Sequence, residues 1–329
     1  MSSLEHLRAE ASKRCDLRAR SRNAFPCDEE QMFEETKTIG LELQRQTGAF
    51  GLIPLQPFSS LNVLDLCAAP GGFTAAILET HPDAKVTALT YGSSVGAHAM
   101  LRPRLRPEAN NMVIEDLERT GLIGKIRAGA TSTVDKATLF LREFQHIVLC
   151  NGQIRHHSYM EAPLTMALNF ELYRLELGIA LSSIAIGGTI VMLLESPEHE
   201  ATAQLLEIFS KFSDVTLFKH DSIHAVDSTF YVVAKNVQPY SPGAAEARIY
   251  CARLSSTEQT GQFYCNTFSD ITRPITVTDD HVSCPRNRFP RLNLGRSTLY
   301  HTAGGAIRPI WQIQMRALSS AIAEPTIAE

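Results

Sequence analysis

The chain has 329 residues, a formal net charge of -4, 44% hydrophobic residues and 20% charged residues. This balance is typical of a globular protein of one or two domains and excludes a disordered or collagen-like chain. The weak net charge also excludes a strong global attraction to nucleic acid or to an anionic membrane.

Seven cysteines are scattered along the chain, and no two stand at CxxC spacing. An odd, dispersed set argues against a disulfide scaffold and against a structural metal site. No run approaches the roughly 18 apolar residues of a membrane-spanning helix, so no membrane partner is expected. The Arg-rich start contains acidic residues and has no apolar signal core. We therefore expect a cytoplasmic protein, with a nuclear location as the alternative, and leave the oligomeric state open.

Two helical patterns precede the first strand. Residues 1–24 predict a polar, basic helix, which is either a solvated surface helix or an arm that contacts phosphate. Residues 28–47 predict an amphipathic helix with Asp28 as its N-cap and Gly48 directly after its last turn. We group residues 1–48 as N-terminal helices.

From residue 61 onward, short apolar runs alternate with helical patterns. Strands are predicted at 61–66, 85–89, 112–114, 146–150, 189–194, 215–218 and 229–234, and helices at 73–80, 135–144, 163–186 and 198–212. Three of the strands are apolar almost throughout, which fits strands buried on both faces of a parallel sheet. The alternation indicates an α/β layered fold. No helix-length segment separates the last two strands, so they are expected to form an antiparallel hairpin at one edge.

A C-terminal extension at 239–329 follows a domain that we place at 49–238. Within the extension, Pro, Gly and Ser mark residues 239–245 as a linker. Residues 246–300 predict irregular or small β-rich structure, and residues 308–323 predict a closing helix.

The most informative string runs from Val63 to Thr74 and reads Val-Leu-Asp-Leu-Cys-Ala-Ala-Pro-Gly-Gly-Phe-Thr. A buried strand leads into a tight turn and then a helix, and the two glycines let a ligand approach the backbone closely. The free N–H groups at the helix start favour an anionic group, while Asp65 at the strand end can accept a hydrogen bond from an ammonium group. An amino-acid-like ligand fits both features. The string lacks G-x-G-x-x-G and the Walker lysine, which disfavours NAD and ATP.

This string resembles motif I of S-adenosylmethionine (SAM)-dependent methyltransferases. Its Asp-Leu-x-Ala-Ala-Pro-Gly-Gly core looks like that of the FtsJ-like (RrmJ-type) ribose 2′-O-methyltransferase family, and segments at 89–101 and 309–314 resemble its fungal branch. Further segments similar to the family lie at 113–116, 146–153, 175–194 and 230–234. The resemblance implies a class I SAM-methyltransferase Rossmann-like sheet, mostly parallel with an antiparallel edge hairpin, and SAM as the cofactor.

The resemblance also assigns a cofactor site. The expected contacts are Asp65, Ala68, Pro70, Gly71, Gly72, Phe73, Tyr91 and Asp116. Asp116 would contact the adenine amino group. The second strand ends without the acid that often holds the ribose hydroxyls. Either Tyr91 stacks on adenine instead, or the cofactor binds weakly.

The FtsJ-like family is described as using a Lys-Asp-Lys-Glu tetrad to make a ribose hydroxyl nucleophilic. Lys37 is the candidate for the first lysine. Asn151 stands at the aspartate position, Leu193 at the second lysine and Thr229 at the glutamate. None of these three side chains carries the charge of the residue that it replaces. This disfavours ribose methylation by the family mechanism, although the resemblance keeps an RNA ribose 2′-OH among the possible acceptors.

Polar residues after the fourth strand form a second candidate catalytic group. His156, His157 and Tyr159 are either acid–base groups for an acceptor or part of an ordinary surface loop. Adjacent histidines without a carboxylate pair do not predict a metal site. Lys219 and His224 are further candidates, as a substitute lysine and as a base near the last strand.

Three functions stay open. The first is methyl transfer from SAM to a small-molecule acceptor or to RNA, for which arginines alternating with Phe289 at 286–296 are the best nucleic-acid candidate. The second is a repurposed, non-methylating enzyme of the same fold, such as a cyclase or pericyclase of fungal secondary metabolism, since Leu193 suits an apolar pocket. The third is a non-catalytic binding protein, because fold alone does not fix function.

Overall fold

The computed structural model describes residues 28–51, 60–90, 100–101, 104–105, 112–116, 144–153, 162–197, 199–252 and 296–323. Two predicted helices, at 1–24 and 135–144, lie outside these residues except for Phe144, and so does most of the predicted irregular segment 246–300. Among the described residues, no helix is both long and apolar enough to cross a membrane.

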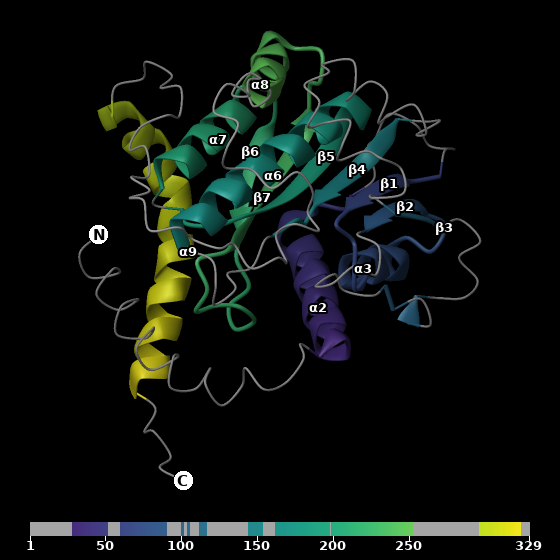
Figure 1. The fold of residues 1–329 in the computed structure, drawn as a ribbon, viewed down its shortest axis with the longest axis horizontal. Helices are drawn as coiled ribbons and strands as arrows, with labels where there is room; N and C mark the ends of the chain where they lie inside the picture. The colour runs from purple at the N-terminus through teal and green to yellow at the C-terminus, as the bar shows by residue number, and fades with distance from the viewer. Residues whose placement is uncertain are drawn as a thin grey trace, which may run out of the picture.

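The described strands form one sheet in the order β3-β2-β1-β4-β5-β7-β6 (Figure 1). Their bounds are β1 Asn62–Leu66, β2 Lys85–Thr90, β3 Met112–Asp116, β4 Gln145–Cys150, β5 Ile184–Leu194, β6 Asp214–Phe218 and β7 Phe230–Val237. Strands β1 to β5 pair in parallel, whereas β7 lies antiparallel between β5 and β6. The predicted α/β sheet, mostly parallel with an antiparallel edge pair, is confirmed.

Helices cover both faces of the sheet (Figure 1). Helices α2 (Glu29–Thr47) and α3 (Gly72–Thr80) cover one face, and α6 (Ala162–Ser183), α7 (Glu200–Ser210), α8 (Pro242–Ala252) and α9 (Arg296–Ala323) contribute to the other. Alternate strand residues therefore enter two different cores. Val63 and Val191 pack towards α2 and α3, whereas Leu64 and Ile190 pack towards α6 and α7. Burial on both sides explains why these strands are apolar throughout.

Helix α2 has the ends that the sequence predicts. The Asp28 carboxylate accepts backbone N–H groups of the first turn, and Gly48 ends the helix at φ +63° in the left-handed region. Its buried Ile39 and Leu43 pack into the same core as α3 and the sheet. The described part of the segment 1–48 is thus packed onto the domain that follows it.

The predicted boundary between helix 163–186 and its following strand is wrong. Helix α6 ends at Ser183 and β5 already begins at Ile184. Ile184 pairs with Gln145 of β4, and the register shifts further along, between Gln145 and Ile147. Pairing with a neighbouring strand overrides the local helical pattern, and an irregularity of this kind is invisible to periodicity.

In the C-terminal extension the predicted linker is wrong, whereas the predicted closing helix is confirmed but begins earlier. The linker 239–245 is partly helical, since α8 begins at Pro242, and proline suits the first turn of a helix. Helix α8 packs against the protein through Ala244 and Ala247, which are buried in the core that also contains side chains of α6 and α7. The closing helix α9 begins at Arg296 rather than at residue 308.

Candidate functional site

The carboxyl ends of β1 and β4 meet where the strand order reverses direction, which is where open α/β sheets bind ligands. The turn after β1 begins at Cys67, and the turn after β4 begins at Asn151. The two are joined by a hydrogen bond from the Asn151 N–H to the Leu66 carbonyl, at 3.3 Å. The site therefore forms between two adjacent turns.

Asp65 is completely buried at this edge. Its carboxylate accepts hydrogen bonds from the Thr74 hydroxyl at 2.6 Å and from the Asn151 side-chain amide at 3.3 Å. Burial raises the pKa of Asp65 to about 7, against the opposing effect of these two hydrogen bonds. Its described contacts include no cation, so an ammonium group brought to this edge would favour the ionised carboxylate. The structure thus brings together two predicted residues, Asp65 and Asn151.

Gly71 has a backbone that only glycine adopts readily, with φ at +111°. A Cβ atom there would also lie 3.2 Å from the Met100 side chain. Gly72 is required for a different reason, because a Cβ there would collide with Thr36 and with the α2 backbone, including the Lys37 nitrogen at 2.6 Å. The first glycine shapes the turn, and the second lets α2 pack against the start of α3.

The other predicted cofactor residues of this turn are buried. Ala68 donates its N–H to the Leu89 carbonyl at 2.9 Å, and Pro70 follows a cis peptide bond. Phe73 is 4% exposed, and its ring lies 5.4 Å from that of Tyr231 in the core beneath α2 and α3. The Phe73 side chain therefore belongs to the core, and only its backbone faces the turn.

Asp116 ends β3, where it pairs in register with Thr90 at the end of β2. This places Asp116 at the same edge of the sheet as Asp65, two strands away. β2 ends in a threonine rather than an acid. Tyr91, His156, His157 and Tyr159 lie outside the described residues, so their predicted roles stay predictions.

Lys37 is not brought to Asn151 by its described contacts. Its ammonium lies 2.7 Å from the Glu79 carboxylate. Glu79 lies in the last turn of α3, at the opposite end of that helix from the glycine turn. A catalytic role for Lys37 would require this ion pair to break.

Leu193 and Thr229 are the residues that the resemblance places at two further positions of the tetrad. Leu193 pairs with Tyr231 across β5 and β7 and packs against the core beneath α2 and α3. Thr229 directly precedes β7, and its carbonyl oxygen accepts a hydrogen bond from the Lys219 ammonium at 2.6 Å.

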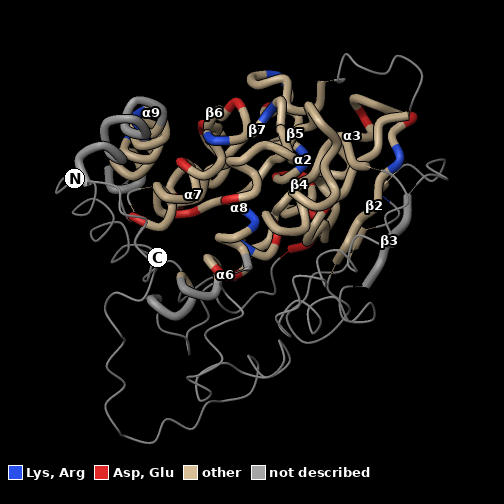
Figure 2. The backbone as a smooth tube through the Cα atoms, turned by 90° about the horizontal axis from the view of Figure 1, so that it is seen from above, with Lys and Arg blue, Asp and Glu red and all other residues tan. Residues whose placement is uncertain are grey.

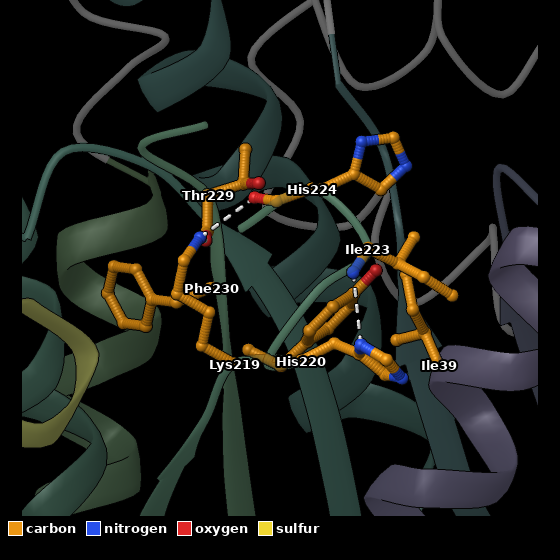
Figure 3. Close-up of a pocket in the computed structure, with 8 residues that line it drawn as sticks. Ile39, Lys219, His220, Ile223, His224, Thr229 and Phe230 are labelled. Carbon is orange, nitrogen blue, oxygen red and sulfur yellow. Dashed lines mark hydrogen bonds between the residues drawn. The ribbon is translucent and has the colours of Figure 1, made fainter. Parts of the chain in front are cut away.

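Lys219 holds the loop between β6 and β7 (Figure 3). Its ammonium also donates to the His224 carbonyl at 3.1 Å. A further hydrogen bond, at 3.0 Å, goes to the Asp227 carbonyl. The His224 ring lies 3.0 Å from the Asp227 carboxylate and 3.4 Å from that of Glu35 on α2. The contacts of Lys219 and His224, the two further candidates from the sequence, therefore hold the loop between β6 and β7 in place.

The cavity beside this loop is small. It is lined by Ile39, Lys219, His220, Ile223, His224, Thr229, Phe230 and Tyr231, and its volume is about 20 Å³. That volume holds about one water molecule, so the cavity does not accommodate an acceptor substrate.

Sequence reasoning missed Glu176 of α6. This side chain is 2% exposed, and its Oε1 accepts the Gly152 N–H at 2.9 Å, directly beneath the turn after β4. Burial raises the pKa of Glu176 to about 8. The available signal was an acid between Leu175 and Leu177, directly before the apolar residues 177–181.

Charges of both signs are interspersed along the described chain, and neither sign forms a continuous track there (Figure 2). The Arg-rich segment 286–296 lies outside the described residues except for Arg296. Among the described residues, no group of three or more His, Cys, Asp or Glu side chains is arranged to hold a metal ion.

Comparison with known proteins gives a family match and distant structural likenesses. The family model for FtsJ-like methyltransferases matches residues 42–237. A solved ribosomal RNA methyltransferase from Plasmodium falciparum is 18% identical, with a TM-score of 0.45, over 61% of this chain and 96% of that one. Human methyltransferase-like protein 13, solved with SAH, is 13% identical, with a TM-score of 0.37, over 69% of this chain and 93% of that one. No curated protein sequence matches the chain.

The family match spans more than half of the chain and includes all seven strands of the sheet. It also includes the glycine turn and the adjacent turn after β4, which form the candidate site. The chain therefore belongs to the FtsJ-like methyltransferase family.

Proposed function

We propose that the chain binds SAM between the turns after β1 and β4 and transfers its methyl group to an acceptor. The observation that carries this proposal is the pairing of the Gly71 turn with Asp65, a buried carboxylate whose described contacts are two neutral donors. The start of α3 suits the carboxylate of the methionine part, and Asp65 suits its ammonium group.

The fit to the rest of SAM is less complete. Asp116 lies at the same edge, as an adenine contact requires, but Thr90 occupies the strand end at which an acid would hold the ribose. The residues present thus fit the methionine part best. We expect weaker binding than in a site with the ribose acid.

SAM supplies an electrophilic methyl group, so the chain's own residues need chiefly to bind and align the two reactants. Deprotonating a ribose hydroxyl is the harder task. Two observations support an acceptor that does not need the tetrad: Leu193 packs against a core, and Lys37 is paired with Glu79. We therefore propose an acceptor that ionises easily or is already nucleophilic, and favour a small molecule over an RNA ribose.

Turnover of SAM tests the proposed acceptor class. The chain is incubated with methyl-labelled SAM and with capped RNA, ribosomal RNA or a macromolecule-free cell extract, and S-adenosylhomocysteine is measured. We expect product with the small-molecule fraction and none with either RNA. Product with RNA alone would overturn the choice of acceptor, and SAM binding without turnover in any arm would favour the non-methylating alternatives.

The matched variant restores the family pattern. The triple change Asn151→Asp, Leu193→Lys and Thr229→Glu returns the charges that ribose methylation uses. Ribose methylation by this variant and not by the wild type would support loss of the tetrad as the reason for a changed acceptor. Ribose methylation by the wild type itself would contradict it.

A further inference from the structure

A carboxyl group on α6 supports both turns of the candidate site from beneath. Oε1 of Glu176 accepts a hydrogen bond from the Gly152 N–H at 2.9 Å, and the Cys67 sulfur lies against the same glycine beside this carboxyl group. Three segments that are distant in sequence therefore meet at one side chain: the turn after β1, the turn after β4 and α6.

The packing around this carboxyl group is tight. A Cβ atom on Gly152 would lie 2.8 Å from Oε1 of Glu176, 3.1 Å from the Cys67 sulfur and 2.7 Å from the Leu172 side chain. The turn after β4 can thus approach Glu176 only because residue 152 is glycine. The position of Asn151, one residue earlier, depends on the same contact.

The second oxygen of Glu176 and the side-chain oxygen of Asn151 are both buried, and neither has a hydrogen-bond partner among the described residues. The titratable groups that face Glu176 from the surrounding elements are Asp65, Cys67, Cys150 and Tyr173, none of them a cation. A buried carboxyl group in such surroundings is stable in its neutral form and costly when ionised.

We propose that Glu176 is a positioning residue of the cofactor site. Its carboxyl group holds Gly152 against the Cys67 turn, so that Asn151 and Asp65 are presented to SAM. This inference rests on the proposed function. Glu176 acts through the two turns and does not itself touch the cofactor.

Ionisation of Glu176 would place a second negative charge near Asp65, inside a core that offers it no cation among the described residues. Burial raises the pKa of Glu176 to about 8, so the group is mainly neutral at pH 7 and mainly charged at pH 9. The neutral fraction falls about tenfold across that range, and the affinity for SAM should fall with it.

Calorimetric titration of SAM from about pH 6.5 to 9.5 tests this role in the full chain. The amino group of SAM titrates in every sample, so the quantity compared is the difference between wild type and variant. Glu176→Gln keeps an oxygen for the Gly152 N–H and cannot ionise, and should therefore bind as the wild type does at pH 7 without the tenfold alkaline loss. Glu176→Leu should bind at least tenfold more weakly at every pH. Glu207→Gln, on α7, is the matched control and should follow the wild type.

Hydrogen exchange of the Gly152 amide gives a readout that needs no ligand. Its protection should fall at least tenfold in Glu176→Leu and persist in Glu176→Gln, in samples whose circular dichroism shows the native fold. Unchanged protection in a folded Glu176→Leu variant would overturn the inference.

The failures of the two proposals are distinguishable. SAM binding with the same pH profile in wild type and Glu176→Gln overturns the role of Glu176 and leaves the proposed function standing. Absence of SAM binding to the wild type overturns both.

Discussion

Replacing Gly72 by alanine tests the close packing of α2 against the start of α3, next to the candidate site. The added Cβ would collide with Thr36 and with the Phe33 carbonyl and would lie 2.6 Å from the Lys37 nitrogen. Two of these groups belong to the α2 backbone, which cannot rotate away as a long side chain can. Helix α2 must therefore retreat from α3 or the turn must move.

The expected cost follows from the size of that movement. Ordinary carbon contacts need about 3.5 Å, so α2 would have to retreat by roughly 1 Å. Overpacking of this kind costs about 1–3 kcal/mol, and the retreat also loosens Ile39 and Leu43 in the core beneath. We expect a loss of about 3 kcal/mol, which for a domain of this size lowers Tm by about 6–12 °C.

Urea and thermal unfolding of the two matched alanine variants measure this cost. Gly48→Ala is the control, since Gly48 also has a positive φ, of +63°, but a Cβ there would meet nothing within 4 Å. Its cost should be about 1 kcal/mol, from backbone strain alone. Equal stability of Gly72→Ala and Gly48→Ala would refute the packing of α2 against the start of α3.

Three further predictions follow from buried groups. Lys219→Met should lower the free energy of unfolding in urea by about 2–4 kcal/mol, because three carbonyls lose their hydrogen-bond donor. The control Lys211→Met breaks a partly exposed ion pair and should lower it by less than about 1 kcal/mol. Burial raises the pKa of Glu176 from 4.5 to about 8, so the folded state keeps a proton that the unfolded state loses, and stability falls as pH rises through this window. Glu176→Gln should remove about 5 kcal/mol of that fall, and parallel pH–stability curves of wild type and variant would contradict this reasoning. Burial also raises the pKa of Cys150 well above the usual range, so this thiol should react with iodoacetamide only as the chain unfolds, and fast labelling of Cys150 in the native chain would contradict its burial.

Local signals made part of the fold predictable. Asp28 and Gly48 mark the two ends of α2 because a cap acts within a few residues of its own position. The apolar strands and the glycine turn likewise carry their structure in consecutive residues. These signals were enough to predict the sheet, its antiparallel edge and the edge at which the site lies.

Contacts between distant segments were not predictable in the same way. Strand β5 begins at Ile184 because it pairs with β4, although the local pattern is helical. The sequence predicts Gly72 as a ligand-facing residue, whereas in the structure α2 packs against it. Glu176 gave no local sign that its partners are Gly152 and Cys67, because these come from the ends of two other strands.

Calorimetric titration of SAM into the wild type and into Gly71→Ala tests the central claim most directly. Gly48→Ala serves as the control, because it introduces the same side chain at another positive φ, far from the turns of the site along the chain. The account predicts one SAM per chain for the wild type and for Gly48→Ala, and binding at least tenfold weaker for Gly71→Ala. No binding to the wild type at millimolar SAM, or equal affinity in all three proteins, would contradict a cofactor site at the glycine turn.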